Sequence, residues 1–273
     1  MIKKITLLSI LISYLLLSFN TYANLLISPT RIQFEERQRV AKVIVINQSD
    51  ETKTYRLEWQ EKIAKAGGGY VNYTKEQINP TALSSMVRLS PSQVRLAPGE
   101  RQIVKIALRK PKDLPSKEYR SHLLFKALPN EEESSDASFG IRLNMILSYS
   151  IPVILRENVI EPKVNISNVA VVKGEKADAL NVSLERQGPF SSFGKLEVFY
   201  KEQGSSTERK IATLNDYSIY PEVERTNVNL SLFDGGKLPN KGEVRIIYTG
   251  LNEFKNIVFA EKSINISSLN LVN

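Results

Sequence analysis

Cysteine is missing from this chain of 273 residues, and histidine occurs once, at His122. Without cysteine the protein has no disulfide, no thiol nucleophile and no thiolate ligand. A single histidine cannot form a multi-histidine zinc site, so we predict no metal centre and no cofactor. Hydrophobic cores alone must stabilise the fold, and a chain of this length can build them.

Runs of one charge are also missing, although the formal net charge is +8. Lysine and arginine are spread along the chain, so nothing indicates nucleic-acid binding. The triple glycine at residues 67–69 lacks the Gly-Lys-Ser/Thr sequence of a phosphate-binding loop, and we interpret it as a hairpin turn. No Ser-His-Asp set can be assembled around His122. We therefore predict no catalytic residues, with a carboxylate-only hydrolase as the enzyme class left open.

Only one long hydrophobic run is present, at residues 5–19. Lys3 and Lys4 precede it, and the small-x-small sequence Thr-Tyr-Ala follows at residues 21–23. This pattern is typical of a secretory signal peptide, and the run is shorter than the roughly 20 residues of a membrane-spanning helix. We predict a signal peptide over residues 1–23, cleavage after Ala23, and a mature chain without membrane insertion.

The rest of the chain alternates apolar and polar residues in short segments bounded by Gly, Pro, Asn, Asp or Ser, without a convincing amphipathic helix. The predicted strands are 25–34, 40–46, 54–61, 86–96, 101–109, 119–128, 139–155, 165–172, 179–184, 195–200, 210–213, 227–232, 243–248 and 257–265. About seven strands in each half predict an all-β protein of two β-sandwich domains in series. The pattern breaks near residue 158, which predicts domains over residues 24–157 and 158–273.

The longest alternating stretch lies at residues 139–155, where every odd position is apolar or aromatic. A typical strand has about 5–6 residues, so this row is unusually long. It must be covered by the chain itself or offered to a partner. Pro152 lacks a backbone N–H, which argues against a central position for the whole strand. The Glu- and Ser-rich residues 130–138 predict a solvated loop before it.

Four stretches, together with the strand at 139–155, resemble a known family. They are SPTRIQF (28–34), VIVINQSDETKTYRLEWQE (43–61), RLSPSQVRLAPGERQIVKI (88–106) and EYRSHLLFKALP (118–129). They are similar to the PapD-like periplasmic chaperones of the chaperone–usher pathway, and the resemblance extends over the whole mature chain. In lacking cysteine from the first domain and in the sequence YRSHLLF (119–125), the chain resembles the non-classical or archaic branch of this family.

The resemblance implies two immunoglobulin-like domains set at an angle, like a boomerang, in a periplasmic protein. It implies binding of pilin or fimbrial subunits by donor-strand complementation and their delivery to an outer-membrane usher. In this mechanism the chaperone lends a long strand to a subunit that lacks its own last strand. The donor residues would be Phe139, Ile141, Leu143, Met145 and Leu147.

The family also holds the subunit's C-terminal carboxylate between the two domains with a pair of basic residues. Arg31, in SPTRI, matches the first of them, and the alternative is an ordinary surface arginine on a strand. The second basic position falls on Pro152. Either another residue, such as Arg156 or Arg88, supplies this charge, or the anchoring differs, and this choice stays open.

A competing function is an exported structural or adhesive surface protein built from two immunoglobulin-like domains. Such a protein would share the fold and the export signal, but it would not explain the length of the strand at 139–155. His122 and Trp59 are predicted to be packing residues in either case.

Overall fold

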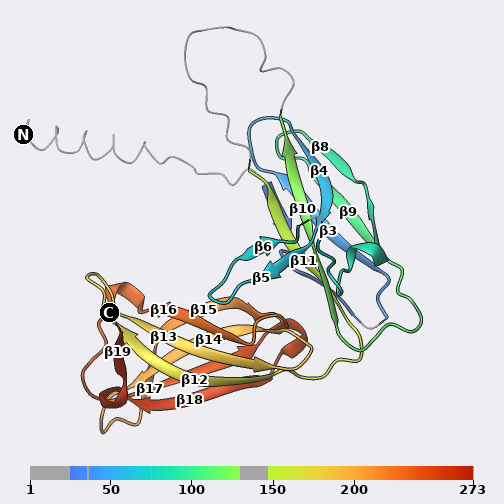
Figure 1. Cartoon of the computed structure of the whole chain (residues 1–273). Coiled ribbons are helices and arrows are strands. Elements are labelled where there is room, and N and C mark those ends of the chain that lie inside the picture. Colours follow the sequence, from blue (N-terminus) through green and yellow to red (C-terminus); the bar gives the residue numbers. More distant parts are fainter. Residues whose placement is uncertain (1–24, 36, 75, 130–146, 273) are drawn as a thin grey trace, which may run out of the picture.

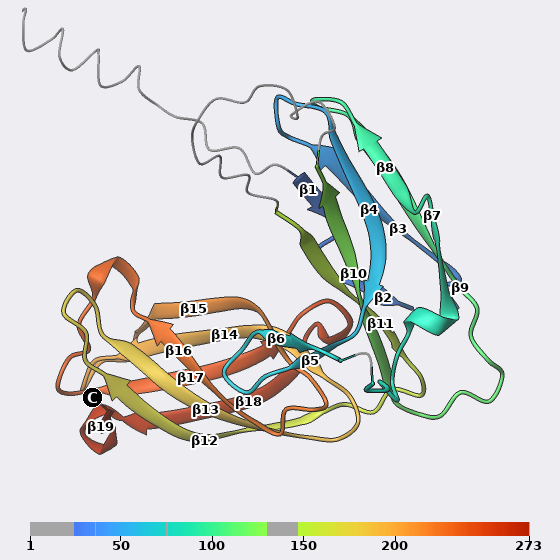
Figure 2. The ribbon, with the colours of Figure 1, turned by 45° about the horizontal axis from the view of Figure 1, so that its top comes forward.

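The computed structural model describes residues 25–35, 37–74, 76–129 and 147–272 (Figure 1). Within these ranges the elements are strands and short 3-10 turns, with no α-helix. Two β-sandwiches follow one another along the chain and lie at an angle (Figures 1 and 2). The predicted fold class is confirmed. The predicted signal peptide lies outside the described residues.

The first sandwich is built from two antiparallel-rich sheets whose inner faces form one core. One sheet has the order β1 (Leu25–Ser28), β3 (Val40–Asn47), β9 (Arg101–Leu108), β7 (Val87–Ser90). The other has the order β2 (Ile32–Phe34), β11 (Tyr149–Arg156), β10 (Glu118–Leu128), β4 (Lys53–Gln60), β8 (Gln93–Leu96). Val43, Val104, Phe125 and Val153 are completely buried between them.

The chain changes sheets at Pro29, between β1 and β2. The single strand predicted over residues 25–34 thus divides into β1 and β2. The predicted segment 86–96 divides in the same way, into β7 and β8 on opposite sheets. A proline follows the last residue of β7, where it removes a ladder N–H and favours a break.

The second sandwich has its own core. Its sheets have the orders β16 (Arg225–Ser231), β13 (Ala179–Gln187), β12 (Lys163–Val172), β19 (Asn270–Val272), and β15 (Glu208–Ile219), β14 (Ser192–Lys201), β17 (Glu243–Gly250), β18 (Val258–Asn265). The two core clusters span residues 25–155 and 166–266. The exact domain boundary near residue 158 stays a prediction.

A small hairpin projects from the first sandwich toward the second. It consists of β5 (Lys62–Ala64) and β6 (Tyr70–Asn72), and both views show it beside the second sandwich (Figures 1 and 2). The glycines at its tip have φ values of 88°, 98° and 77°, which a residue with a Cβ rarely adopts. The predicted hairpin is confirmed, and its Ala64 packs against the second core.

Strand β11 is the described part of the long alternating stretch. It starts at Tyr149, so the prediction of a strand was wrong for Leu147 and Ser148. The ladder between β10 and β11 ends at the pair Phe125 and Tyr149, so Leu147 and Ser148 do not pair with β10. Parallel pairing with β2 covers only residues 153–155 of the other edge. Among the described strands, none pairs with that edge over residues 149–152.

Candidate functional site

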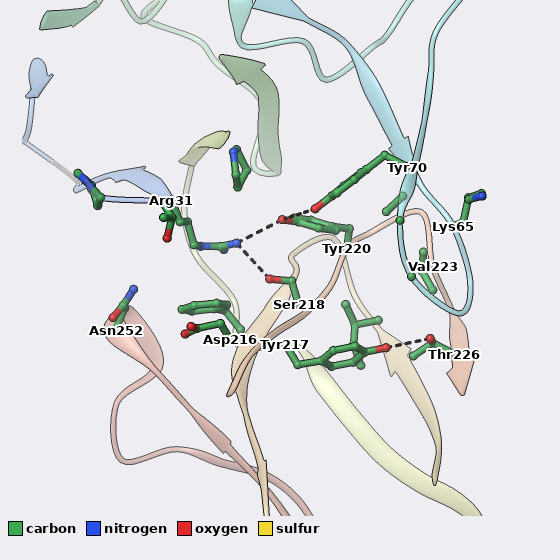
Figure 3. Close-up of a pocket in the computed structure, with 18 residues that line it drawn as sticks. Arg31, Lys65, Tyr70, Asp216, Tyr217, Ser218, Tyr220, Val223, Thr226 and Asn252 are labelled. Atoms are coloured by element: carbon green, nitrogen blue, oxygen red, sulfur yellow. Dashed lines mark hydrogen bonds between the residues drawn. The ribbon is translucent and has the colours of Figure 1, made fainter. Parts of the chain in front are cut away.

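A cavity of about 400 Å³ opens between the two sandwiches. Its walls come from the sheet switch after β1, the β5–β6 hairpin, β11 and the residues around the end of β15. The lining includes Pro29, Arg31, Tyr70, Pro152, Phe193, Tyr217 and Tyr220 (Figure 3). It is thus an aromatic and proline-walled cleft with a guanidinium inside it.

Arg31 reaches across the junction from the segment before β2. Its Nη1 donates to Ser218 Oγ at 3.2 Å and to the Tyr220 hydroxyl at 3.4 Å (Figure 3). The guanidinium carbon lies 4.3 Å from the centre of the Phe193 ring, and the side chain is 9% exposed. Arg31 is therefore a largely buried interdomain side chain and not an ordinary surface arginine.

The other edge of this guanidinium has no hydrogen-bond acceptor. Nε and Nη2 are buried, and in the described part of the chain neither donates a hydrogen bond. Nη2 lies 3.7 Å from Glu253 Oε1, a distance that supports only a loose ion pair. Buried donors without acceptors are unfavourable, and a planar fork can bind both oxygens of a carboxylate. The cleft is chemically suited to receive one.

The position at which the resemblance expects a second basic anchor residue carries no charged side chain. Pro152 lines the cleft where the resemblance places that residue. Arg156 has a side chain only 1% exposed and is occupied by ion pairs, while Arg88 is exposed on β7 in the far sheet. Lys65 is the other basic residue among the described lining residues, but its side chain points away from Arg31 (Figure 3).

A buried ionic cluster lies beside this cleft. Glu118 Oε2 accepts hydrogen bonds from Arg156 Nε at 2.9 Å, from the Ser191 backbone N–H at 2.9 Å and from the Ser191 hydroxyl at 2.7 Å. Burial opposes ionisation of this carboxyl, but the Arg156 charge and the Ser191 hydrogen bonds outweigh it and lower the pKa of Glu118. The ionised pair joins the first sandwich to the second.

Glu253 connects the ionic cluster to the cleft. Its Oε1 accepts a short hydrogen bond from Arg156 Nη1 and also faces Arg31 Nη2. Arg156 Nη1 donates to Gln33 as well, at 2.9 Å. Glu253 would therefore keep a cationic partner if Arg31 bound another carboxylate.

Glu118, Arg120 and His122 lie on the face of β10 that meets the junction, because side chains alternate along a strand. Arg120 forms an ion pair with Glu222 of the second sandwich and donates to the Lys62 carbonyl at 3.2 Å. Burial acts to lower the pKa of Arg120, but the Glu222 carboxylate raises it by more. Arg120 is thus held as a cation that ties the base of the hairpin to the second sandwich.

His122 is the next residue on this face and is 1% exposed. Both ring nitrogens lack a hydrogen-bond partner among the described residues, and the ring meets Tyr70 edge-on at 4.8 Å. Burial, followed by the charges of Arg120 and Lys62, lowers the pKa of His122 to about 3. The predicted packing role agrees with this placement, and so does that of Trp59, which packs against the first core.

Most of the proposed donor residues lie outside the described residues, namely Phe139, Ile141, Leu143 and Met145. Leu147 is described, and it is 48% exposed just before β11. Their donor role stays a prediction.

The described ranges contain no helix long and apolar enough to cross a membrane. They also contain no group of three or more His, Asp or Glu side chains that could hold a metal ion.

Sequence reasoning found Arg31 but missed the residues that surround it. Ser218, Tyr220, Glu222 and Glu253 belong to the second sandwich and lie 97 or more positions from their partners in the first. No local motif marks them. The tyrosine at the start of β6, Tyr70, follows the triple glycine directly, and this position was the one available signal.

Comparison with known proteins supports one family. Residues 24–160 match the family of pili and flagellar-assembly chaperones, PapD N-terminal domain. A search of curated protein sequences finds no match to this chain.

Similar solved structures have low identity. The Salmonella enterica SafA pilin in complex with the SafB chaperone is 16% identical, with a TM-score of 0.45, covering 89% of this chain and 97% of that one. The chaperone–tip adhesion subunit complex CsuC–CsuE from the archaic Csu pili of Acinetobacter baumannii is 12% identical, with a TM-score of 0.43, covering 92% and 100%. The E. coli chaperone DraB is 14% identical, with a TM-score of 0.42, covering 90% and 96%. Because the family match spans half of the chain, this protein belongs to the PapD-like family of pilus-assembly chaperones.

Proposed function

We propose that this protein is a periplasmic chaperone that binds pilin subunits by donor-strand complementation and delivers them to an outer-membrane usher. Membership of the pilus-assembly family supports the proposal. The observation that carries it is the buried Arg31, whose Nε and Nη2 have no acceptor within the described residues. A subunit's C-terminal carboxylate would supply both missing acceptors.

The free edge of β11 supports the second half of the mechanism. Pro152 lies both on this edge and in the wall of the cleft. Residues 149–152 have no described partner on the side opposite β10, so a subunit strand could pair there and continue toward Leu147. Strand addition of this kind provides main-chain hydrogen bonds and places alternate side chains in pockets.

The apolar row supplies the driving force. Ile151, Val153 and Leu155 already fill the first core, so the odd positions from Phe139 to Leu147 are the ones left for a partner. Burying each large apolar side chain contributes about 1.5–3 kcal/mol before ordering costs are subtracted. Binding needs no covalent step, and we infer that the protein is not an enzyme. A purely structural surface protein would leave the unsatisfied edge of Arg31 without a role.

The test is to replace Leu143, Met145 and Leu147 with serine and to co-express the variant with a pilin-type subunit. We expect the one-to-one complex to be lost while the circular dichroism spectrum and melting temperature stay unchanged. The matched control replaces Leu26, Val40 and Ile103, exposed apolar residues on the opposite sheet of the same sandwich, with serine. Undiminished recovery of subunit with the first variant would refute strand donation.

A further inference from the structure

The β5–β6 hairpin is fastened to one segment of the second sandwich. Glu222 Oε1 accepts from the Ala64 backbone N–H at 2.8 Å, and Thr226 Oγ1 accepts from the Gly67 backbone N–H at 3.2 Å. The Tyr70 hydroxyl donates to the Tyr220 hydroxyl at 3.2 Å. All three acceptors lie within residues 220–226, from the end of β15 to the start of β16, so the hairpin docks as a unit.

Tyr220 is the residue at which the hairpin meets the cleft. The guanidinium carbon of Arg120 lies 3.8 Å from the centre of its ring. Its hydroxyl oxygen accepts from Tyr70 on one side and from Arg31 Nη1 on the other (Figure 3). The hydroxyl therefore cannot move without disturbing the guanidinium of Arg31.

Tyr70 is itself held in place. Tyr70 pairs with Ala64 across the hairpin, and the glycine tip makes the tight turn that allows this register. Its ring packs edge-on against His122, with an interplanar angle of 69°. The hairpin and β10 thus fix the position of the Tyr70 ring, and the Tyr70 hydroxyl reaches Tyr220 from it.

We propose that the hairpin is a positioning element for Arg31, acting through Tyr70 and Tyr220, an inference that rests on the proposed carboxylate-binding role of this arginine. Tyr220 and Ser218 occupy Nη1, which turns the Nε and Nη2 edge away from them and leaves it for a ligand. The binding edge is correctly aimed only when the hairpin is docked. Tyr70 is a positioning residue, since it contacts Arg31 only through Tyr220.

The experiment removes single hydroxyls with Tyr70→Phe and Tyr220→Phe in the full mature chain. The first readout is the solvent exchange rate of the Arg31 Nε proton, measured by NMR in the free protein and assigned by its loss in Arg31→Ala. Loss of one partly buried hydrogen bond should accelerate this exchange about three- to tenfold in either variant. Tyr200→Phe is the control, because the Tyr200 hydroxyl donates a hydrogen bond to the Lys241 carbonyl at 3.1 Å and contacts neither the hairpin nor the cleft.

The second readout is the dissociation rate of a co-purified pilin-type subunit, expected to rise by a similar factor in Tyr70→Phe and Tyr220→Phe. If Arg31→Ala changes neither the rate of subunit capture nor the rate of subunit dissociation, the carboxylate anchor is refuted, and the hairpin's role with it. If Arg31→Ala loses the subunit but Tyr70→Phe changes neither exchange nor dissociation, only the positioning role of the hairpin is overturned.

Discussion

His122 illustrates how a buried side chain can set a pH dependence without serving in binding. Its pKa is lowered to about 3, while the unfolded chain has a value near 6.5. Between these two values the unfolded state binds a proton that the folded state does not. Stability attributed to His122 is therefore complete above pH 6.5 and falls as the pH drops toward 3.

We predict that His122→Gln flattens this part of the stability curve. The free energy of unfolding of the wild type should fall by about 1.4 kcal/mol more per pH unit than that of the variant between pH 6 and pH 4. Urea denaturation at pH 7, 6, 5 and 4 measures both curves. Parallel curves would show that the His122 imidazole is protonated in the folded protein at these pH values, beside Arg120 and Lys62, and would contradict the lowered pKa.

Arg31 and Pro152 mark how far single residues can be predicted from sequence. The surrounding SPTRI stretch identifies Arg31 through the family resemblance. Its partners Ser218, Tyr220 and Glu253 come from another sandwich, and pairing over such distances leaves no local pattern. The same limit applies to the second basic residue of the carboxylate anchor. Pro152 stands at its position, and no local sequence pattern identifies another residue that could replace it.

At the scale of elements, β14 and β17 approach closely at a pair of glycines. Gly194 lies opposite Gly250, and a Cβ on Gly194 would stand 2.2 Å from the Thr249 carbonyl oxygen. Backbone atoms cannot yield as a flexible side chain does. The glycine is therefore required by packing between the strands and not by its own φ.

We predict that Gly194→Ala lowers the free energy of unfolding by about 3 kcal/mol, at the upper end of overpacking effects. Gly204→Ala is the matched control, because its φ is +82° but nothing lies within 4 Å of the added methyl. That substitution should cost only about 1 kcal/mol, from backbone strain. Equal losses in chemical denaturation would contradict the packing argument.

Alternation predicts most strands well, since β3, β4 and β9 each have one face on the core. Strand β19 escapes prediction because its three residues show no period. Residues 86–96 look continuous in sequence, yet they form β7 and β8 on different sheets. Pro91 favours a break there, but tertiary packing decides which sheet each half joins, because both halves carry the same alternating pattern.

At the scale of the whole molecule, charged side chains fasten one sandwich to the other. Arg156 of β11 bonds to Glu118 in its own sandwich and to Ser191 and Glu253 in the next. Arg120 and Glu222 form a second tie on the hairpin side. The angle between the sandwiches therefore depends on a few polar contacts around the cleft.

We predict that Arg156→Met destabilises the protein by about 3–5 kcal/mol, because Glu118 is left as a buried carboxylate without its cation. Calorimetry should show the two sandwiches unfolding at more widely separated temperatures than in the wild type. Arg245→Met is the control, since its pairs with Glu208 and Glu261 are exposed and worth less than about 1 kcal/mol. Coincident transitions in Arg156→Met would show that other contacts couple the sandwiches.

The parallel pairing of β2 with β11 joins the two ends of the first sandwich. Ile32 lies beside Val153, which is 153 − 32 = 121 positions later in the chain. Contacts of such separation slow folding, because a long loop must close before they form. In the periplasmic location that we propose, a chain emerging from an export channel in N-to-C order must hold β2 unpaired until β11 has followed it. Until then the chaperone is itself an unfinished sandwich, with the same need for a last strand that we propose for its subunits.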